Sequence, residues 1–381
     1  PVALAGMRAG LEDKCFSCYG GVQYGDKYMR CWIAEKKRTH GQLSLEDAIK
    51  VSCNAYFYQF GNAAGIDQIV TMGKLLGLGQ KSGLPISGES PGVLPGPAWL
   101  NSVNPRARWS NGLTANTAIG QGDVLASPLQ MAVVAAAVAN GGTVYYPRLI
   151  DRVVSQDGKI VQQDPPRVRS NLPTDAGLTA SQINHVRQGM WRVVNDGGGT
   201  AGRAKNSEMT TAGKTGTAQF WRSGIKDNHT WFISFAPFEN PEYVVVVFVQ
   251  GAKSGGGVSA PIAAKILDGI HKYKTGKEDI HLAALEPAKG NFLFTESIDF
   301  GREVAATNKL FDDGETAQSP SATGQEDRPA AEPTVRADAD EAGRVQNKNQ
   351  PRVEKAQPAT DGAGSRPADA KPKSNPIGNL F

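Results

Sequence analysis

The stretch AGKTGTAQF (residues 212–220) places an ammonium group, a hydroxyl group and a glycine in consecutive positions at the start of a β-prone run. Alternate side chains of a strand face opposite ways, so we expect Lys214 and Gly216 on one face and Thr215 and Thr217 on the other, unless the strand twists beside a cleft. The glycine permits the close approach of a ligand or another backbone. Such a strand can bind a peptide through its main chain while the ammonium and hydroxyl groups hold a carboxylate. Taken alone, the triplet also fits a strand end that merely carries a lysine.

The segments around this stretch predict an antiparallel sheet flanked by helices. Two β-prone runs follow at 231–235 and 243–249, and short connecting turns are typical of antiparallel neighbours. An amphipathic pattern over 179–194 predicts a helix before the sheet, and a terminal helix is expected from about 260 to 273. The expected fold class is therefore α+β.

The part of the chain before these segments is expected to be mainly helical. Residues 1–10 read as the remainder of a helix that ends at Gly10. The run 44–47 resembles a capping box that opens a helix, whose apolar face continues through Phe57 and Phe60. The other expected elements are a helix at 66–76, a long functional loop at 80–117, a buried helix at 127–138 and a strand at 143–154.

Length and composition limit the class of protein. The 381 residues carry a net charge of +4, too small and too dispersed to indicate nucleic-acid binding. No apolar window of about 18 residues predicts a membrane span. We expect one folded domain over 1–280 and a disordered tail over 281–381, where aromatic residues become rare. The chain opens on Pro1 within a helical pattern, so we expect a fragment whose beginning is missing.

A second motif, Ser52-Cys53-Asn54, pairs a small hydroxyl with an amide two residues on, within the apolar helical stretch. Alone, Ser52 and Asn54 also fit polar residues on a helix surface. Together with the Lys-Thr-Gly strand, they match two of three motifs of penicillin-recognising serine acyltransferases. That chemistry needs an activated serine, a hydroxyl that carries a proton to the leaving amine, an amide that aligns substrate, and N–H groups for the oxyanion.

The chain resembles class B penicillin-binding proteins over about residues 1–275. The shared motifs are Ile119-Gly120-Gln121-Gly122 before Ser127-Pro128-Leu129-Gln130-Met131-Ala132, the run 213–219, and Phe232 with Phe235-Ala236-Pro237. Three further motifs resemble the penicillin-binding protein 2 group: Arg30-Cys31-Trp32, His40-Gly41, and the run 52–58. The resemblance implies a penicillin-binding protein and β-lactamase-like fold, and a peptidoglycan D,D-transpeptidase that cross-links cell wall during elongation.

The resemblance also implies a role for each matching residue. Ser52 would relay a proton, Asn54 would hold the substrate amide, Lys214 and Thr215 would engage the substrate or β-lactam carboxylate, Gly216 would allow close approach, and the Thr217 N–H would contribute to the oxyanion hole. The implied ligands are a D-Ala-D-Ala stem peptide and β-lactams, with no organic cofactor. The implied partners are a membrane glycosyltransferase and elongation-complex proteins, at the periplasmic face of a bacterial inner membrane, with the anchor outside this chain.

One family motif is missing. No Ser-x-x-Lys precedes Ser52, and the match at 223–226 lies in a glycine-containing loop without a helix N-terminus to activate it. We therefore expect the nucleophile and its lysine upstream of Pro1, and expect the chain as given not to be acylated. Two other functions stay open, a serine β-lactamase or D,D-carboxypeptidase relative, and a non-catalytic penicillin-binding-like module.

All four cysteines fall before residue 54, which indicates either disulfides or a metal site. One set has the residue types of a tetrahedral structural zinc site: Cys18, Cys31, His40 and Cys53. The resemblance implies zinc ligands at these positions. Cys15 is an alternative first ligand, and one or two disulfides are the alternative to zinc. A metal here would link the Ser52–Asn54 turn to the preceding segment.

Overall fold

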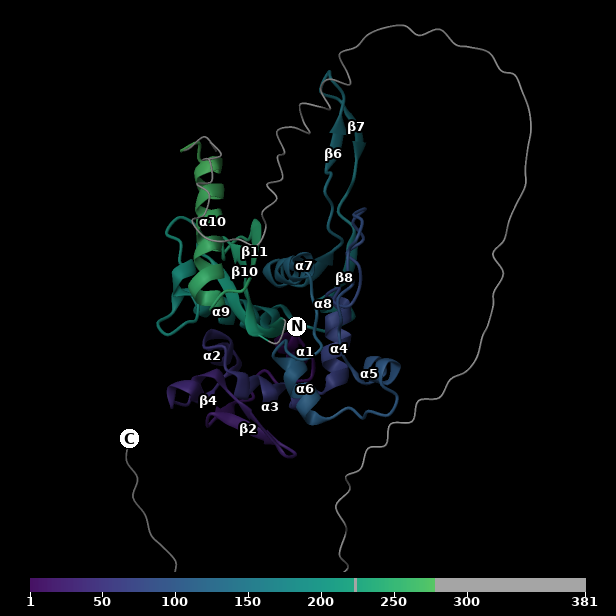
Figure 1. Cartoon of the computed structure of the whole chain (residues 1–381). Helices are drawn as coiled ribbons and strands as arrows, with labels where there is room; N and C mark the ends of the chain where they lie inside the picture. The colour runs from purple at the N-terminus through teal and green to yellow at the C-terminus, as the bar shows by residue number, and fades with distance from the viewer. Residues whose placement is uncertain (223–224, 278–381) are drawn as a thin grey trace, which may run out of the picture. The chain divides into compact units, whose positions relative to one another are not determined.

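The Lys-Thr-Gly stretch forms part of strand β9 (Ala212–Arg222) in a three-stranded antiparallel sheet (Figure 1). The computed structural model describes residues 1–222 and 225–277. The strand order is β11 (Tyr243–Gln250), β10 (Ile225–Ala236), β9, with Lys214 opposite Ile233. Among the described residues, β9 is therefore an edge strand. The predicted antiparallel order is confirmed.

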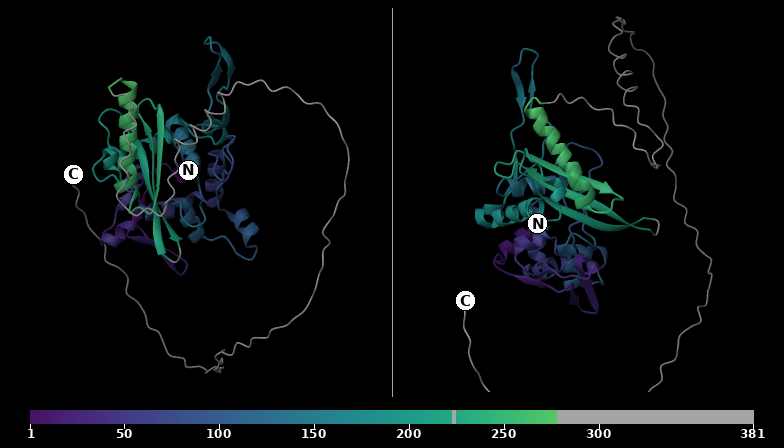
Figure 2. Two further views of the ribbon diagram at one scale, coloured as in Figure 1. Left: turned by 45° about the horizontal axis from the view of Figure 1, so that its top comes forward. Right: turned by 90° about the vertical axis from the view of Figure 1, so that its left-hand side faces the viewer.

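Helices cover both faces of this sheet. Helix α10 (Ala260–Lys274) lies on one face and α7 (Pro128–Ala139) on the other (Figure 2). Phe232 and Leu267 are fully buried in the core. The π-helical turn η3 (Gly255–Ser259) leads into α10, and a buried hydroxyl pair, Thr230 Oγ1 and Ser259 Oγ at 3.0 Å, joins it to β10. Both predicted helices are confirmed.

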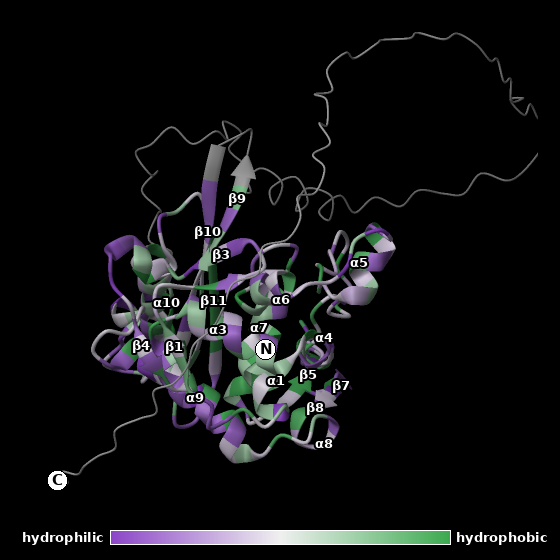
Figure 3. Cartoon of the chain, turned by 90° about the horizontal axis from the view of Figure 1, so that it is seen from below, coloured by the Kyte–Doolittle hydropathy of each residue, from purple (hydrophilic) through white to green (hydrophobic). Residues whose placement is uncertain are grey.

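Helix α1 (Val2–Arg8) lies in the middle of the helical part, with Leu4 and Met7 buried. It packs on α3 (Asn54–Ala64) and α4 (Ile66–Leu75), and a Cβ on Gly6 would come within 2.1 Å of the Phe60 ring. Hydrophobic residues gather around α1 and α7 (Figure 3), where one continuous core joins the helices to the sheet. The helical residues 1–10 were predicted correctly.

Helix α2 (Leu45–Lys50) is held against α9 (Ala180–Asn195). The Ile49 side chain packs against Gly189 of α9, where a Cβ would come within 2.8 Å of the isoleucine. At the rim, Arg192 pairs with Asp47 at 2.8 Å and with Asp196 at 2.9 Å. Because α9 also packs on β9, this contact fixes the end of α2 relative to the Lys-Thr-Gly strand.

Three expectations were wrong. The helix opened at 44–47 does not run on through Phe57, because the chain leaves helical geometry at 51–53 and restarts as α3. The loop 80–117 contains α5 (Pro97–Val103) and α6 (Asn111–Ala118). The strand at 143–154 is two strands, β5 (Thr143–Tyr145) and β6 (Arg152–Val154), separated by residues around Pro147.

The short strands form small two-stranded sheets, and β6 with β7 (Ile160–Gln163) makes an exposed hairpin that projects from the body (Figure 1). The remaining elements are β1 (Phe16–Cys18), β2 (Gly21–Tyr24), β3 (Lys27–Arg30), η1 (Trp32–Lys36), β4 (Gly41–Leu43), β8 (Val168–Asn171), α8 (Leu172–Asp175) and η2 (Gly202–Ala204). None of the described helices is long and apolar enough to cross a bilayer. The predicted tail, 281–381, lies outside the described residues, as do positions 223 and 224 of the rejected Ser-x-x-Lys match.

Candidate active site and cysteine cluster

Ser52 lies where α2 ends and has the left-handed backbone angle φ 52°. The N–H of Cys53 bonds to the Ala48 carbonyl at 3.0 Å, and the N–H of Ser52 bonds to the Ile49 carbonyl at 3.2 Å. This pair of bonds is the Schellman ending of a helix, in which the left-handed position is usually glycine. Cys53 then caps α3, its sulfur accepting from the Tyr56 N–H at 3.4 Å. The motif is therefore a tight turn between two helices.

The turn directs the Ser52 hydroxyl at the Lys-Thr-Gly strand. Lys214 Nζ donates a hydrogen bond to Ser52 Oγ and another to its neighbour's carbonyl, Thr215 O, at 2.9 Å. Ser52 Oγ lies 3.4 Å from Thr200 Oγ1, which lies 2.8 Å from Thr215 Oγ1. Lysine and three hydroxyls thus form one continuous hydrogen-bonded chain, and three of its four members were predicted from the sequence.

Burial lowers the pKa of Lys214 from 10.5 to about 8. Desolvation disfavours the ammonium form, and no carboxylate forms a salt bridge with Lys214 in the described structure. Its charge is thus available to an anionic ligand.

Thr200 is the member of the chain that sequence reasoning missed. It follows the glycine run 197–199, in the connection between α9 and β9, and its own N–H bonds to the Lys50 carbonyl at 3.3 Å. The available signal was a glycine-rich turn that ends in a hydroxyl residue shortly before the predicted strand.

The other predicted site residues are Thr217, Gly216 and Asn54. The Thr217 carbonyl accepts from Gln121 Nε2 at 3.3 Å, which brings the 119–122 motif to β9. Gly216 lies under Trp231, and a Cβ would meet that side chain at 3.2 Å. Asn54 lies in the first turn of α3. Among the described contacts, Asn54 is not joined to the hydroxyl chain.

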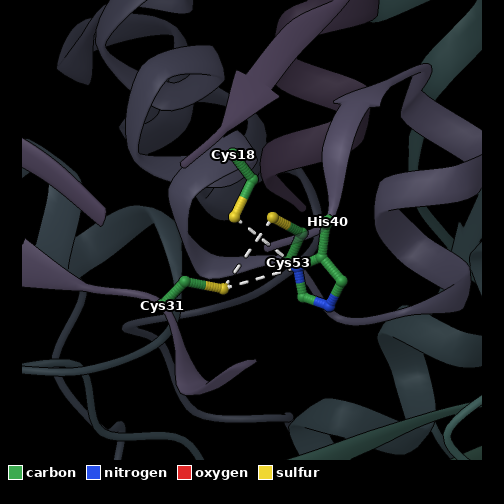
Figure 4. Close-up of side chains that lie close together, drawn as sticks. All are labelled: Cys18, Cys31, His40 and Cys53. Carbon is green, nitrogen blue, oxygen red and sulfur yellow. Dashed lines mark hydrogen bonds between the residues drawn. The ribbon is translucent and has the colours of Figure 1, made fainter. Parts of the chain in front are cut away.

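Cys18, Cys31, His40 and Cys53 point toward one another from four separate segments (Figure 4). Their ligand atoms all lie within 4.8 Å of one another. Cys31 Sγ lies 3.9 Å from Cys53 Sγ, and His40 Nδ1 lies 3.6 Å from the sulfurs of both Cys18 and Cys31. The hydrogen bond from Cys53 lowers the pKa of the Cys31 thiol, which favours a thiolate.

These distances can be compared with a zinc tetrahedron. Zn–S bonds of about 2.3 Å and a Zn–N bond of about 2.05 Å would separate two sulfurs by about 3.8 Å and a sulfur from a nitrogen by about 3.6 Å. The three separations given above, one between two sulfurs and two between a sulfur and the His40 nitrogen, are close to these values. All four cysteines carry free thiols, and Cys15 is exposed, outside the cluster. The residues present therefore fit a tetrahedral zinc ion.

A mixed helix and sheet fold with a Lys-Thr-Gly edge strand facing a Ser-x-Asn turn defines the class of penicillin-recognising serine acyltransferases. The penicillin binding protein transpeptidase domain matches residues 1–268. The chain belongs to the penicillin-binding protein transpeptidase family.

The curated relatives include a peptidoglycan D,D-transpeptidase and a sporulation protein. The chain is 33% identical over 260 residues to peptidoglycan D,D-transpeptidase MrdA of Haemophilus influenzae, covering 64% of this chain and 38% of the relative. It is 32% identical over 276 residues to stage V sporulation protein D of Bacillus subtilis, covering 70% and 39%. The chain therefore spans well under half the length of these relatives.

Solved structures share the fold. Penicillin-binding protein 2 of Pseudomonas aeruginosa, in complex with WCK 5153, superposes with a TM-score of 0.61 at 32% identity, covering 70% of this chain and 56% of that one. Penicillin-binding protein 2 of Helicobacter pylori, in complex with MreC, gives 0.59 at 27% identity, covering 72% and 50%.

Proposed function

We propose that this chain is part of a peptidoglycan D,D-transpeptidase. The observation that carries the proposal is the hydrogen-bonded chain Lys214, Ser52, Thr200 and Thr215 on an edge strand. An edge strand can take an extended stem peptide by main-chain pairing. The chain's ammonium and hydroxyl groups meet the terminal carboxylate of D-Ala-D-Ala, and a β-lactam carboxylate occupies the same position.

Each residue then has a defined task in acyl transfer. Lys214 and Thr215 bind the carboxylate, and the Thr200 hydroxyl fixes the Thr215 hydroxyl by a hydrogen bond. Ser52 Oγ accepts the proton of the attacking serine and passes it to the leaving D-Ala amine. Asn54 aligns the substrate amide, and the Thr217 N–H stabilises the oxyanion. The acyl group is carried by the serine of a Ser-x-x-Lys pair, which residues 1–51 do not contain.

We propose that the cysteine cluster binds one structural zinc ion. The four donors are Cys18, Cys31, His40 and Cys53, and their spacing supports tetrahedral coordination. When bound, zinc supplies a cross-link between segments and no reaction chemistry. Cys53 lies between Ser52 and Asn54, so the cross-link restrains the catalytic turn directly. No organic cofactor is proposed.

We further propose a periplasm-facing location at a bacterial inner membrane, as for other penicillin-binding protein 2 group members. The complex of the Helicobacter pylori relative with MreC supports an MreC-type elongation protein as a partner. A membrane glycosyltransferase partner is also proposed, on family resemblance alone.

The test uses an extended protein, in which the chain is joined at Pro1 to the preceding Ser-x-x-Lys segment of the Pseudomonas aeruginosa relative. Fluorescent penicillin should label it covalently and persistently, and Lys214→Ala should slow labelling by at least tenfold. The extended protein should also exchange the terminal D-Ala of a stem peptide for an added D-amino acid.

Other outcomes separate the alternatives. Rapid loss of the label with hydrolysed penicillin would indicate a β-lactamase. Release of D-Ala without exchange would indicate a carboxypeptidase. An unlabelled but folded extended protein would contradict the enzymatic proposal and favour a binding module.

A further inference from the structure

The Trp32 side chain contacts the backbone of the catalytic turn. Its indole Nε1 donates to the Ser52 carbonyl at 3.0 Å and to the Val51 carbonyl at 3.2 Å. The indole is partly buried and belongs to η1, a segment that precedes the turn by about twenty positions. The contact therefore comes from outside the helices that the turn joins.

These two carbonyls need external donors because α2 has ended. The last carbonyls of a helix have no partner within it. The Schellman bonds satisfy Ala48 and Ile49, and the Thr200 N–H satisfies Lys50. Only the Trp32 indole reaches the next two, at Val51 and Ser52, among the described hydrogen bonds. Trp32 thus completes the end of α2.

The turn also needs a restraint because its left-handed residue is not glycine. A side chain on a left-handed residue crowds the backbone, and serine gains little local compensation. The hydroxyl of Ser52 is nevertheless the group that meets Lys214. A donor fixed on the Ser52 carbonyl favours the peptide orientation that the left-handed angle requires. In other orientations of this peptide, the hydrogen bond between the Ser52 carbonyl and the indole N–H would be lost.

Trp32 is itself fixed by the cysteine cluster. It directly follows Cys31, and its ring lies 5.4 Å from the His40 ring. The Lys36 ammonium covers the indole at 5.2 Å from the ring centroid. Two of the four cluster residues therefore set the position of the indole, and the indole sets the turn.

We propose that Trp32 is a positioning residue, whose indole N–H holds Ser52 in the left-handed conformation that directs its hydroxyl at Lys214. This inference rests on the proposed function for its catalytic meaning, but its structural part stands on the 381-residue chain alone. The cysteine cluster would then be connected to the Ser52–Asn54 turn in two ways, by Cys53 within the turn and by the Trp32 side chain.

The first experiment uses the 381-residue chain and needs no activity. Trp32 is replaced by 3-benzothienylalanine, which keeps the ring shape and removes the donor, and separately by phenylalanine. The Lys214 ammonium is followed by NMR with ¹³C-labelled lysine, assigned with Lys214→Arg. Loss of the Ser52 acceptor should lower the measured pKa of Lys214 in both variants, since that hydrogen bond favours the charged form. Zinc content should stay at the parent value.

The matched control is Trp109→Phe. The Trp109 indole N–H also donates a hydrogen bond, to Thr114 Oγ1 at 2.8 Å, far along the chain from Ser52. This variant should leave the Lys214 titration unchanged. An unchanged titration in the benzothienyl variant would overturn the proposal. So would a benzothienyl variant that loses zinc or unfolds, because Trp32 would then be a structural residue only.

The second experiment uses the extended protein. The benzothienyl variant should acylate with penicillin at least tenfold more slowly, with the loss in the chemical step and the dissociation constant of the initial complex within about twofold. Failure of the parent extended protein to acylate would count against the proposed function and leave the NMR result decisive for Trp32. A loss confined to initial binding would contradict a role through Ser52.

Discussion

Ser52 occupies a left-handed backbone position that glycine normally fills. We therefore expect the stability of the chain to depend on the side chain at this position. Ser52→Gly and Ser52→Val both remove the hydroxyl and its bond to Lys214, so they differ mainly in backbone freedom. A left-handed residue with a Cβ costs about 1–2 kcal/mol, and a β-branched one is a genuine outlier. Ser52→Gly should therefore be more stable than Ser52→Val by about 2 kcal/mol, measured by urea unfolding of the 381-residue chain. Equal stability would contradict the left-handed turn.

Lys214 makes a pH prediction. In the proposed function its ammonium form binds carboxylate, and its pKa is lowered by burial to about 8. The charged form is complete well below pH 8 and is lost as the pH rises through that value. Penicillin acylation of the extended protein should thus fall above about pH 8, where an ordinary lysine would stay charged. Lys214→Arg cannot deprotonate in this range.

The arginine variant is the control for other titrating groups. Its acylation, although slower, should lose the part of the decline that Lys214 causes between pH 8 and 10. Identical pH profiles for the two proteins would show that the Lys214 charge does not govern binding.

Among the individual site residues, the sequence predicted those that belong to motifs and missed those that are defined only by a contact in the folded structure. Lys214, Ser52 and Thr215 carry a recognisable spacing, and they lie in one hydrogen-bonded chain in the structure. Thr200 joins them only because α9 brings the glycine-rich connection beside α2. Such a contact depends on long-range packing, which local pattern does not encode.

Among the elements, the cysteine cluster joins β1, the start of η1, the segment before β4, and the turn before α3. His40→Ala should therefore lower zinc content from about one per chain and reduce stability. A ligand present at a thousand times its dissociation constant stabilises the folded state by about 4 kcal/mol. Loss of zinc should lower the melting temperature by about 8–16 °C. Elemental analysis and thermal unfolding measure both effects.

Cys15→Ser is the matched control, because Cys15 is an exposed thiol three residues from Cys18 and outside the cluster. It should leave zinc content and melting temperature at the parent values. Purified chain without zinc, and with Cys18, Cys31 or Cys53 in disulfides by mass spectrometry, would support the redox alternative instead.

The elements themselves were predicted best where caps and periodicity agree. Helix α9 has a Thr179 capping box and an apolar stripe, and α7 has the Ser127 box with proline in its first turn. The break between α2 and α3 was missed because its usual signal, a glycine, is absent at position 52. Serine at position 52 supplies a hydroxyl group, but it gives no sequence signal for the turn.

At the scale of the whole molecule, the β6–β7 hairpin stands apart from the core. All of its strand residues are exposed, including Val161 at 69%. A two-stranded hairpin is only marginally stable by itself, so it contributes little to the fold. Replacing 152–163 with two glycines should change the free energy of unfolding by less than about 0.5 kcal/mol. The replacement is feasible because the N–H of Asp164 already bonds to the Asp151 carbonyl at 2.9 Å.

Calorimetry of the 381-residue chain measures this change. As a control, two glycines in place of the buried strand residues at 245 and 247 of β11 should unfold the domain at a much lower temperature. A comparable loss from the hairpin deletion would mean that the hairpin is part of the cooperative unit.

The end of α2 has a consequence for how the protein matures. Its carbonyl groups are capped by Trp32 from one direction and by Thr200 from the other, and in our proposal these contacts direct the Ser52 hydroxyl at Lys214. On this proposal, a nascent or half-assembled chain holds Ser52 and Lys214 apart. If the proposed function holds, the arrangement that a β-lactam recognises exists only in the finished molecule, and a newly made chain passes through a stage that the drug does not bind.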